Sequence, residues 1–210
     1  MSTRSTIFAE GEYYHIYNRG NSKQTIFHDA QDYEHFINLL SVLNTESRMR
    51  LKKASNQSLK EDGVISIGAY CLMPNHFHIL ITQKKEYGIS TFMQKVSTAY
   101  VMYYNKKYKR TGGLFEGKFK SKYVEGDTYM KYLFSYIHLN PLKILDKNWK
   151  LQAKYPSRDM LEFLLSYKYS SFCEYYANVF SVVCKQDFPD YFPTRDLLVK
   201  DVTLWFDASL

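Results

Sequence analysis

Two histidines separated by a single phenylalanine are the residues of this chain best suited to chemistry. The triplet His76-Phe77-His78 lies between two apolar, strand-like segments, residues 68–72 and 79–82. Side chains at positions i and i+2 of a strand point to the same face of a sheet, so the two imidazoles are expected side by side, with Phe77 on the opposite face. Two adjacent imidazoles can provide two ligands of a metal site. Such a site lacks at least one further ligand, and the chemistry lacks a nucleophile.

Tyr136 and Asn140 are candidates for the missing nucleophile and the missing ligand. They lie four residues apart in a helical segment, so they share one face of the helix. The carbonyl oxygen of Asn140 suits a hard divalent ion such as Mg²⁺ or Mn²⁺, and the phenol of Tyr136 is a usable nucleophile if its target is activated or its pKa is lowered. If this helix packs beneath the histidine strand, His76, His78 and Asn140 can hold one metal ion, which would polarise a phosphate for in-line attack by Tyr136.

Each of these residues also has a structural interpretation. A His-X-His pair on a strand can be a satisfied structural pair, and one tyrosine among the 20 of this chain is usually part of the packing. An asparagine before Pro141 is an ordinary helix end. Only the combination indicates a catalytic site, because function depends on a site rather than on a fold.

The composition is that of a globular protein with a basic surface. The 210 residues, of which 45% are hydrophobic, are enough for one large domain or for one domain with an appendage. A net charge of +7 and 17% aromatic residues favour a nucleic-acid partner, since cations meet phosphates and rings stack on unpaired bases. A solvated basic surface over a tyrosine-rich core is the alternative.

Two other classes of protein are disfavoured. The chain has no run of about eighteen apolar residues and its first residues lack an apolar signal core, so we expect a cytoplasmic protein with no membrane partner. Cys71, Cys173 and Cys184 are scattered and form no CxxC pair, so they are expected to be buried thiols rather than zinc ligands.

Hydrophobic periodicity predicts an α+β fold in which helices pack on an antiparallel sheet. Asp29 or Asp32 is expected to cap the first helix, and Asp127 and Pro141 are expected to begin and end the third. The polar stretch 45–63 is either a helical extension or a loop. Strands are expected at residues 13–17, 64–71, 76–82 and about 118–124. Helices are expected at residues 29–43, 89–107 and 128–140.

The pattern changes at about residue 148. We therefore divide the chain into a core, residues 1–148, and a C-terminal extension packed on it, residues 149–210. Within the extension, segments 159–167 and 169–180 are expected to be helical, and the end is expected to be loop-like around its prolines, Pro189 and Pro193.

Cations in two segments are candidate DNA contacts. Lys118, Lys120 and Lys122 alternate with other residues, so a strand would carry them on one face. They could bind successive DNA phosphates, or they could protect an edge strand from aggregation. Further cations crowd the end of the second helix, where they also favour the helix dipole. In that helix Tyr100 and Tyr103 fit the apolar stripe, whereas Tyr104 could stack on a base. The candidate DNA-binding residues are Arg19, Tyr104, Lys106, Lys107, Arg110, Lys118, Lys120 and Lys122.

Three blocks of sequence carry a resemblance to a known family. They are residues 72–80 (LMPNHFHIL), 112–121 (GGLFEGKFKS) and 136–141 (YIHLNP). Together they resemble the signature blocks of single-tyrosine HUH transposases, in particular the branch of REP-associated tyrosine transposases. Segments 14–20 and 167–172 resemble further blocks of that branch, in the same order along the chain.

The resemblance implies a fold, a reaction and a site. The fold would be the ferredoxin-like or RRM-like palm of HUH nucleases, acting as a monomer or a homodimer on single-stranded or hairpin DNA. His76, His78 and Asn140 would hold Mg²⁺ or Mn²⁺. Tyr136 would cut the DNA, leaving a 5′-phosphotyrosine link and a free 3′-hydroxyl, and attack by a second 3′-hydroxyl would rejoin strands.

Two other functions compete with this one. A domesticated protein that binds DNA hairpins without cutting them would show salt-sensitive binding that does not depend on His76 or His78. A metal-dependent hydrolase acting through an activated water would release a free 5′-phosphate and would not need Tyr136.

Overall fold

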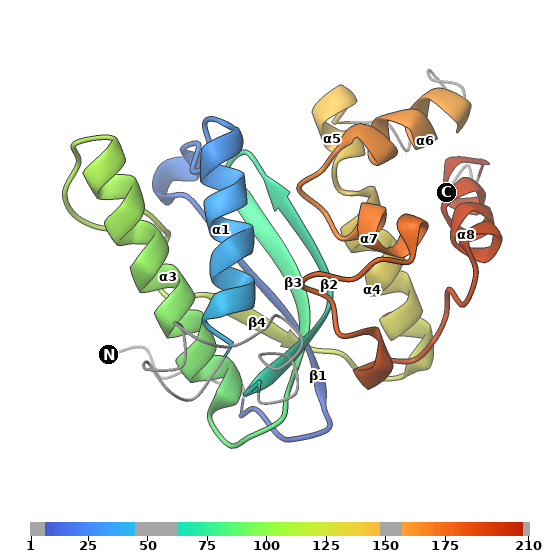
Figure 1. Ribbon diagram of the computed structural model, residues 1–210, viewed down its shortest axis with the longest axis horizontal. Helices are drawn as coiled ribbons and strands as arrows, with labels where there is room; N and C mark the ends of the chain where they lie inside the picture. Colours follow the sequence, from blue (N-terminus) through green and yellow to red (C-terminus); the bar gives the residue numbers. More distant parts are fainter. Residues whose placement is uncertain (1–6, 45–62, 148–156, 208–210) are drawn as a thin grey trace.

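A four-stranded antiparallel sheet organises the chain, as Figure 1 shows for the computed structural model, which describes residues 7–44, 63–147 and 157–207. The strand order β2-β3-β1-β4 puts the histidine strand β3 inside the sheet and β4 at one edge. The predicted α+β fold is therefore confirmed, whereas the polar stretch 45–63 lies, except for Gly63, outside the described residues. The strands are β1 (Tyr13–Arg19), β2 (Ile65–Met73), β3 (His76–Gln83) and β4 (Lys120–Tyr123).

Helices cover both faces of the sheet (Figure 1). On one face, Phe36 of α1 (Ala30–Val42) packs on Phe77 with ring centroids 5.1 Å apart, and α3 (Gly88–Lys107) lies beside α1. On the other face, Tyr136 of α4 (Asp127–Leu139) packs on His78 at 5.5 Å. Because Phe77 and His78 are neighbours in a strand, these contacts confirm that the third predicted helix packs against the histidine side of the sheet.

The position of the histidines follows from a tight hairpin. Met73 pairs with His76, so only Pro74 and Asn75 connect β2 to β3. The turn is held from outside, because the amides of Gly20 and Ile26 donate to the carbonyl oxygens of Asn75 and Pro74, each at 2.8 Å. These bonds fix His76, the first residue of β3, at the end of the sheet where the hairpin turns.

Helix ends differ from the sequence expectation in one case. Asp29 caps α1 as predicted, accepting a hydrogen bond from the Asp32 amide at 3.1 Å. The prediction that Asp127 caps α4 is wrong: Gly126 occupies the cap position with φ of +77°, and the Asp127 carboxylate accepts from the Tyr191 hydroxyl instead. Pro141 follows α4 and is itself helical, starting the short helix α5 (Leu142–Leu145).

The C-terminal part of the chain contacts the free edge of β2. The Leu72 amide donates to the Tyr169 carbonyl and the Ser171 amide donates to the Tyr70 carbonyl, both at 2.9 Å, so backbone groups at this edge are paired. A Cβ on Gly68 would lie 2.6 Å from the ring of Phe188, so glycine permits this close packing. Residues of the predicted extension therefore pack on the sheet. The boundary of the extension at residue 148 stays a prediction.

The extension is more helical than predicted. The expected helix 169–180 is shorter, because Asn178 adopts a left-handed conformation and ends it. The loop-like structure expected around Pro189 and Pro193 is confirmed, but the chain does not stay loop-like after it, since a helix starts two residues after Pro193. Among the described residues, no helix combines the length and the apolar character needed to cross a membrane. The remaining elements are η1 (Asn21–Lys23), α6 (Ser157–Ser166), α7 (Phe172–Ala177), η3 (Lys185–Asp187) and α8 (Arg195–Asp207).

Candidate active site

A cavity of about 370 Å³ lies where β3 begins and β1 ends, on the side covered by α4. It brings together predicted residues from four separate segments of the chain. Its lining residues are Tyr17, Asn18, Arg19, Lys23, Asn75, His76, His78, Lys120 and Tyr136.

The two histidines are held so that one nitrogen of each ring remains available. Nδ1 of His76 lies 2.6 Å from Oδ1 of Asn75; because an amide oxygen only accepts, Nδ1 carries the proton. Nδ1 of His78 lies 2.9 Å from Nε2 of His15, and metal binding through Nε2 of His78 requires the tautomer in which His78 donates this hydrogen bond. In that tautomer both rings offer Nε2 with its lone pair, and the ring centroids are 5.0 Å apart. This donor arrangement fits a divalent ion held by His76 and His78.

Burial keeps these imidazoles neutral. It lowers the pKa of His76 to about 4 and that of His15 to about 4, with nearby cations adding to the effect, and it lowers the pKa of His78 well below its usual value. Neutral imidazole is the form that binds metal, so the pair is in its ligand state at neutral pH.

His15 is a site residue that the sequence analysis did not single out. It lies two residues before Tyr17 on β1, and Tyr17 pairs directly with His78, so His15 shares the histidine face. The alternation of residues 13–17 contained this signal, but only the register of β1 against β3 places His15 behind His78.

Tyr136 presents its ring and hydroxyl to the same face. Its ring centroid is 5.5 Å from that of His78 and 6.2 Å from that of His15. Burial raises the pKa of the Tyr136 phenol, and the neighbouring Asn140 amide opposes the rise. The phenol is therefore protonated at neutral pH, and a nearby cation is needed to stabilise its phenolate.

Asn140 is close to Tyr136 but is buried, with both polar atoms of its side chain already bonded. It is 1% exposed, its Nδ2 donates to the backbone oxygen of Tyr136 at 2.7 Å, and its Oδ1 accepts from Nζ of Lys143 at 2.9 Å. It is not among the residues that line the cavity. Among the described residues, no group of three or more His, Cys, Asp or Glu side chains could hold a metal ion, so a site here needs a ligand of another type.

Lys143 is a second residue that the sequence analysis missed. Its Nζ lies 3.5 Å from the Tyr136 hydroxyl and 4.7 Å from the centre of that ring. The sequence predicted that the helix ends at Pro141, although a lysine seven residues after Tyr136 falls on the same helical face if helical structure continues. Burial lowers the pKa of Lys143, which is half-buried beside the site.

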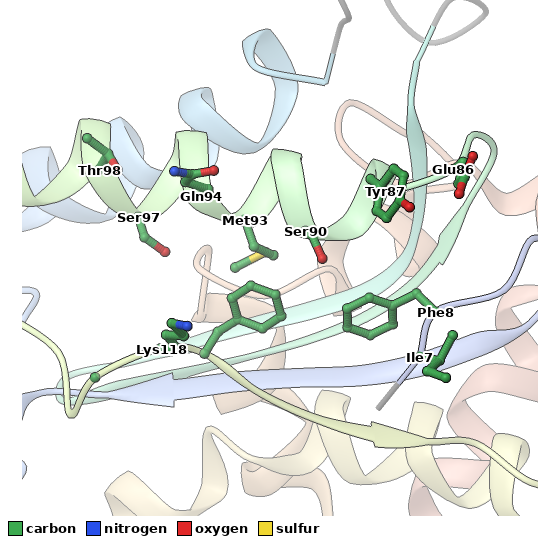
Figure 2. A pocket seen from close by; sticks show the side chains of 12 residues that line it. Ile7, Phe8, Glu86, Tyr87, Ser90, Met93, Gln94, Ser97, Thr98 and Lys118 are labelled. Atoms are coloured by element: carbon green, nitrogen blue, oxygen red, sulfur yellow. The ribbon is translucent and has the colours of Figure 1, made fainter. Parts of the chain in front are cut away.

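The predicted lysine track is only partly correct. Lys120 pairs with Tyr17 and Lys122 with His15, so both lie on the histidine face, and Arg19 lines the cavity while it forms an ion pair with Glu116. Lys118 lies before the strand, next to Gly117 with its φ of +81°. It lines a different hollow of about 790 Å³ under α3, toward which Ser90 and Met93 point in Figure 2.

The predicted contacts at the end of α3 lie on the opposite face of the sheet. Nζ of Lys107 is bound by Asp29 at 2.8 Å and by Asp32 at 2.7 Å. Tyr104 is 3% exposed and its hydroxyl lies 2.8 Å from His28, which contradicts the predicted stacking of Tyr104 on a base. Arg110 packs over the Tyr104 ring, 5.5 Å from its centre, while Lys106 is exposed to solvent at this end.

Comparisons with known proteins identify a family and a similar fold. The family described as "Transposase IS200 like" matches residues 10–140, a range that runs from β1 through Asn140. A solved structure of a REP-associated tyrosine transposase bound to a REP hairpin is similar, with a TM-score of 0.54 and 14% identity over 90% of this chain and 92% of that chain. At this identity the likeness shows a shared fold. A comparison with curated proteins found no match.

Proposed function

Because the chain belongs to the IS200-like transposase family, we propose that it is a metal-dependent endonuclease and strand transferase acting on hairpin-containing single-stranded DNA. The observation that carries the proposal is the placement of the Tyr136 ring against His78, at the cavity that Arg19 and Lys120 also line. A nucleophile, two neutral imidazoles and two cations thus meet at one hollow. The similar solved structure has a REP hairpin bound, which supports a DNA hairpin as the substrate.

The proposed reaction is a transesterification. Oη of Tyr136 gives up its proton to solvent and attacks the scissile phosphorus, and the bond from phosphorus to the 3′-oxygen breaks. The departing 3′-oxygen takes a proton and becomes a free hydroxyl, while the phosphate stays on Tyr136 as a 5′-phosphotyrosine. Attack by a second 3′-hydroxyl reverses these steps and joins the strands.

The residues of the site divide this work. Nε2 of His76 and of His78 would hold a divalent ion, Mg²⁺ or Mn²⁺, which polarises the phosphate when bound. Asn75 and His15 orient the two rings through Nδ1, and Arg19 and Lys120 bind the DNA backbone. Asn140 is proposed as the third ligand, which requires its Oδ1 to exchange Lys143 for the ion.

A covalent adduct tests the proposal. A hairpin oligonucleotide labelled at its 3′ end should transfer the label to the protein, and the label should stay with the protein on a denaturing gel in the presence of Mn²⁺. Tyr136→Phe should abolish the adduct. Tyr104 is buried on the other face of the sheet, so Tyr104→Phe should still form it. An adduct that persists in Tyr136→Phe rules the assignment out.

A hairpin-binding protein that does not cut DNA is the second candidate. It is favoured by the position of Asn140, whose side-chain oxygen is bound by Lys143 and which does not line the cavity. This candidate predicts salt-sensitive hairpin binding by the wild type with no adduct, and equal binding by His78→Ala. A hydrolase would instead release free 5′-phosphate and would remain active as Tyr136→Phe.

A further inference from the structure

We propose that Lys143 is a built-in cation of the site, which holds Asn140 when no metal is bound and stabilises the negative charge on Tyr136 and the phosphate during attack. The inference rests on the proposed function. It adds a residue that competes with the divalent ion for one ligand and yet promotes the chemical step.

The ammonium of Lys143 makes three contacts within the site. Nζ lies 2.9 Å from Oδ1 of Asn140, 3.5 Å from Oη of Tyr136 and 4.7 Å from the centre of the Tyr136 ring. The backbone fixes this position, because Asn140 and Pro141 have helical backbone angles between α4 and α5, and the Lys143 amide donates to the Asn140 carbonyl at 3.1 Å. The lysine is therefore held beside the nucleophile by the short path of the chain.

This ammonium has no carboxylate partner in the described part of the chain. Lys107, Lys131 and Lys185 each form an ion pair with an aspartate, whereas the contacts of Lys143 are an amide oxygen and a phenol. A half-buried cation without an anion is unfavourable, so the site is arranged to receive negative charge. A scissile phosphate and the developing phenolate would provide that charge.

Lys143 also opposes metal binding. Its ammonium occupies Oδ1 of Asn140 at 2.9 Å, and Asn140 is the proposed third ligand beside His76 and His78. A divalent ion that approaches these ligands is repelled by the ammonium and must displace it from Asn140. The two effects of Lys143 thus have opposite signs: weaker metal binding and faster strand transfer.

The test compares Lys143→Met, which removes the charge and keeps an unbranched side chain of similar length, with Lys143→Arg, which keeps the charge. Mn²⁺ affinity is measured by calorimetry on the metal-free protein without DNA, and adduct formation is measured as a single turnover at saturating Mn²⁺. We expect Lys143→Met to bind Mn²⁺ about 3–10-fold more tightly and to form the adduct about 10–100-fold more slowly. Lys143→Arg should stay within a few-fold of the wild type in both measurements. Lys147 is an exposed lysine four residues further along the chain, so Lys147→Met is the control and should change neither measurement.

Other outcomes overturn the inference. Unchanged Mn²⁺ affinity in Lys143→Met excludes the competition, and an unchanged adduct rate excludes the electrostatic role. If affinity and rate fall together with the melting temperature, Lys143 only supports the fold. A wild type that forms no adduct defeats the proposed function, while the Mn²⁺ titration without DNA still tests whether Lys143 competes for the metal site.

Discussion

Two helices on opposite faces of the sheet each carry a cluster of three tyrosines, and the clusters differ in the partners of the tyrosine hydroxyls. On α3, every hydroxyl donates to a fixed acceptor: Tyr100 to the Ile26 carbonyl at 2.6 Å, Tyr103 to Asp32 at 3.0 Å and Tyr104 to the Thr25 carbonyl at 3.3 Å. These phenols tie α3 to the neighbouring chain and act as structural groups.

On α4 the hydroxyl of Tyr136 accepts from the ammonium of Lys143. Tyr103 on α3 also accepts from an ammonium, that of Lys107 at 3.2 Å, but its hydroxyl donates to the Asp32 carboxylate at the same time. Tyr129, Tyr132 and Tyr136 stack along the helix with centroids about 6 Å apart, so packing alone would not distinguish this cluster from the other. An acceptor position beside a cation favours the phenolate, whereas donation to a carboxylate such as Asp32 disfavours it. A tyrosine nucleophile is therefore better recognised by its hydrogen-bond partners than by the number of tyrosines around it.

The largest expected effect concerns the two histidines that lie against these tyrosine clusters. His78→Ala removes a proposed metal ligand next to Tyr136, and we expect adduct formation to fall by about 1,000-fold. His35 stacks on Tyr103 of the α3 cluster at 4.0 Å, so His35→Ala is the matched control and should form the adduct at the wild-type rate. Equal losses in both variants would remove the functional distinction between the two clusters.

The α3 cluster should instead respond in stability. Asp32 is 0% exposed and accepts from Lys107, Tyr103, Tyr108 and the His28 amide, which together hold its pKa low although burial acts in the opposite direction. Asp32→Asn should lower the free energy of unfolding by about 2–4 kcal/mol, because it leaves the Lys107 charge poorly paired. Denaturant unfolding measures this. Adduct formation per folded molecule should not change, and a specific loss of activity would show that the α3 cluster contributes to the reaction.

The buried side of α4 should make stability depend on pH. Burial lowers the pKa of His138 to about 3, whereas the unfolded chain takes up this proton near pH 6.5. The unfolded state therefore binds more protons between these values, so stability is highest above pH 6.5 and falls as the pH falls below it. His138→Gln should remove up to about 1.4 kcal/mol per pH unit from the slope of unfolding free energy in this range. An unchanged slope between pH 4.5 and 6.5 would contradict the neutral buried state of His138.

The smallest expected effect separates the cations of the two faces. Lys120 lines the cavity, so Lys120→Ala should weaken hairpin binding and reduce the slope of log affinity against log salt by about one. Lys106 is exposed at the end of α3, on the other face, and Lys106→Ala should leave the slope unchanged. Titrations of labelled hairpin DNA at several salt concentrations measure both. A larger change for Lys106 would mean that DNA also contacts the α3 face.

Local pattern was enough to predict the main components of the candidate site. Alternation in β3 predicted that His76 and His78 lie on one face of the sheet. The helical repeat predicted that Tyr136 and Asn140, four residues apart, lie on one face of a helix. The apolar stripe of α4, including Leu133 and Ile137, is buried as expected. These predictions succeeded because each depends on the geometry of a single strand or helix.

Contacts between elements could not be predicted in the same way. His15 supports His78 only through the register of β1 against β3, and Lys143 reaches Tyr136 only because the chain remains helical through Pro141. The predicted DNA-binding lysines also differ in their surroundings. Lys120 lines the cavity, whereas Lys107 forms an ion pair with Asp32 across the α1–α3 interface. Charge alone did not indicate which lysine would meet a carboxylate.

The amino-acid sequence therefore determined the class of fold, the orientation of the two histidines and the helical pairing of Tyr136 with Asn140. These features depend on backbone periodicity, which extends over a few residues. Tertiary structure decided that Tyr136 meets His78, that Asn140 faces Lys143 and that Tyr104 is buried. Those outcomes depend on which face of the sheet each helix covers, and this is set by long-range packing of apolar surface rather than by local spacing.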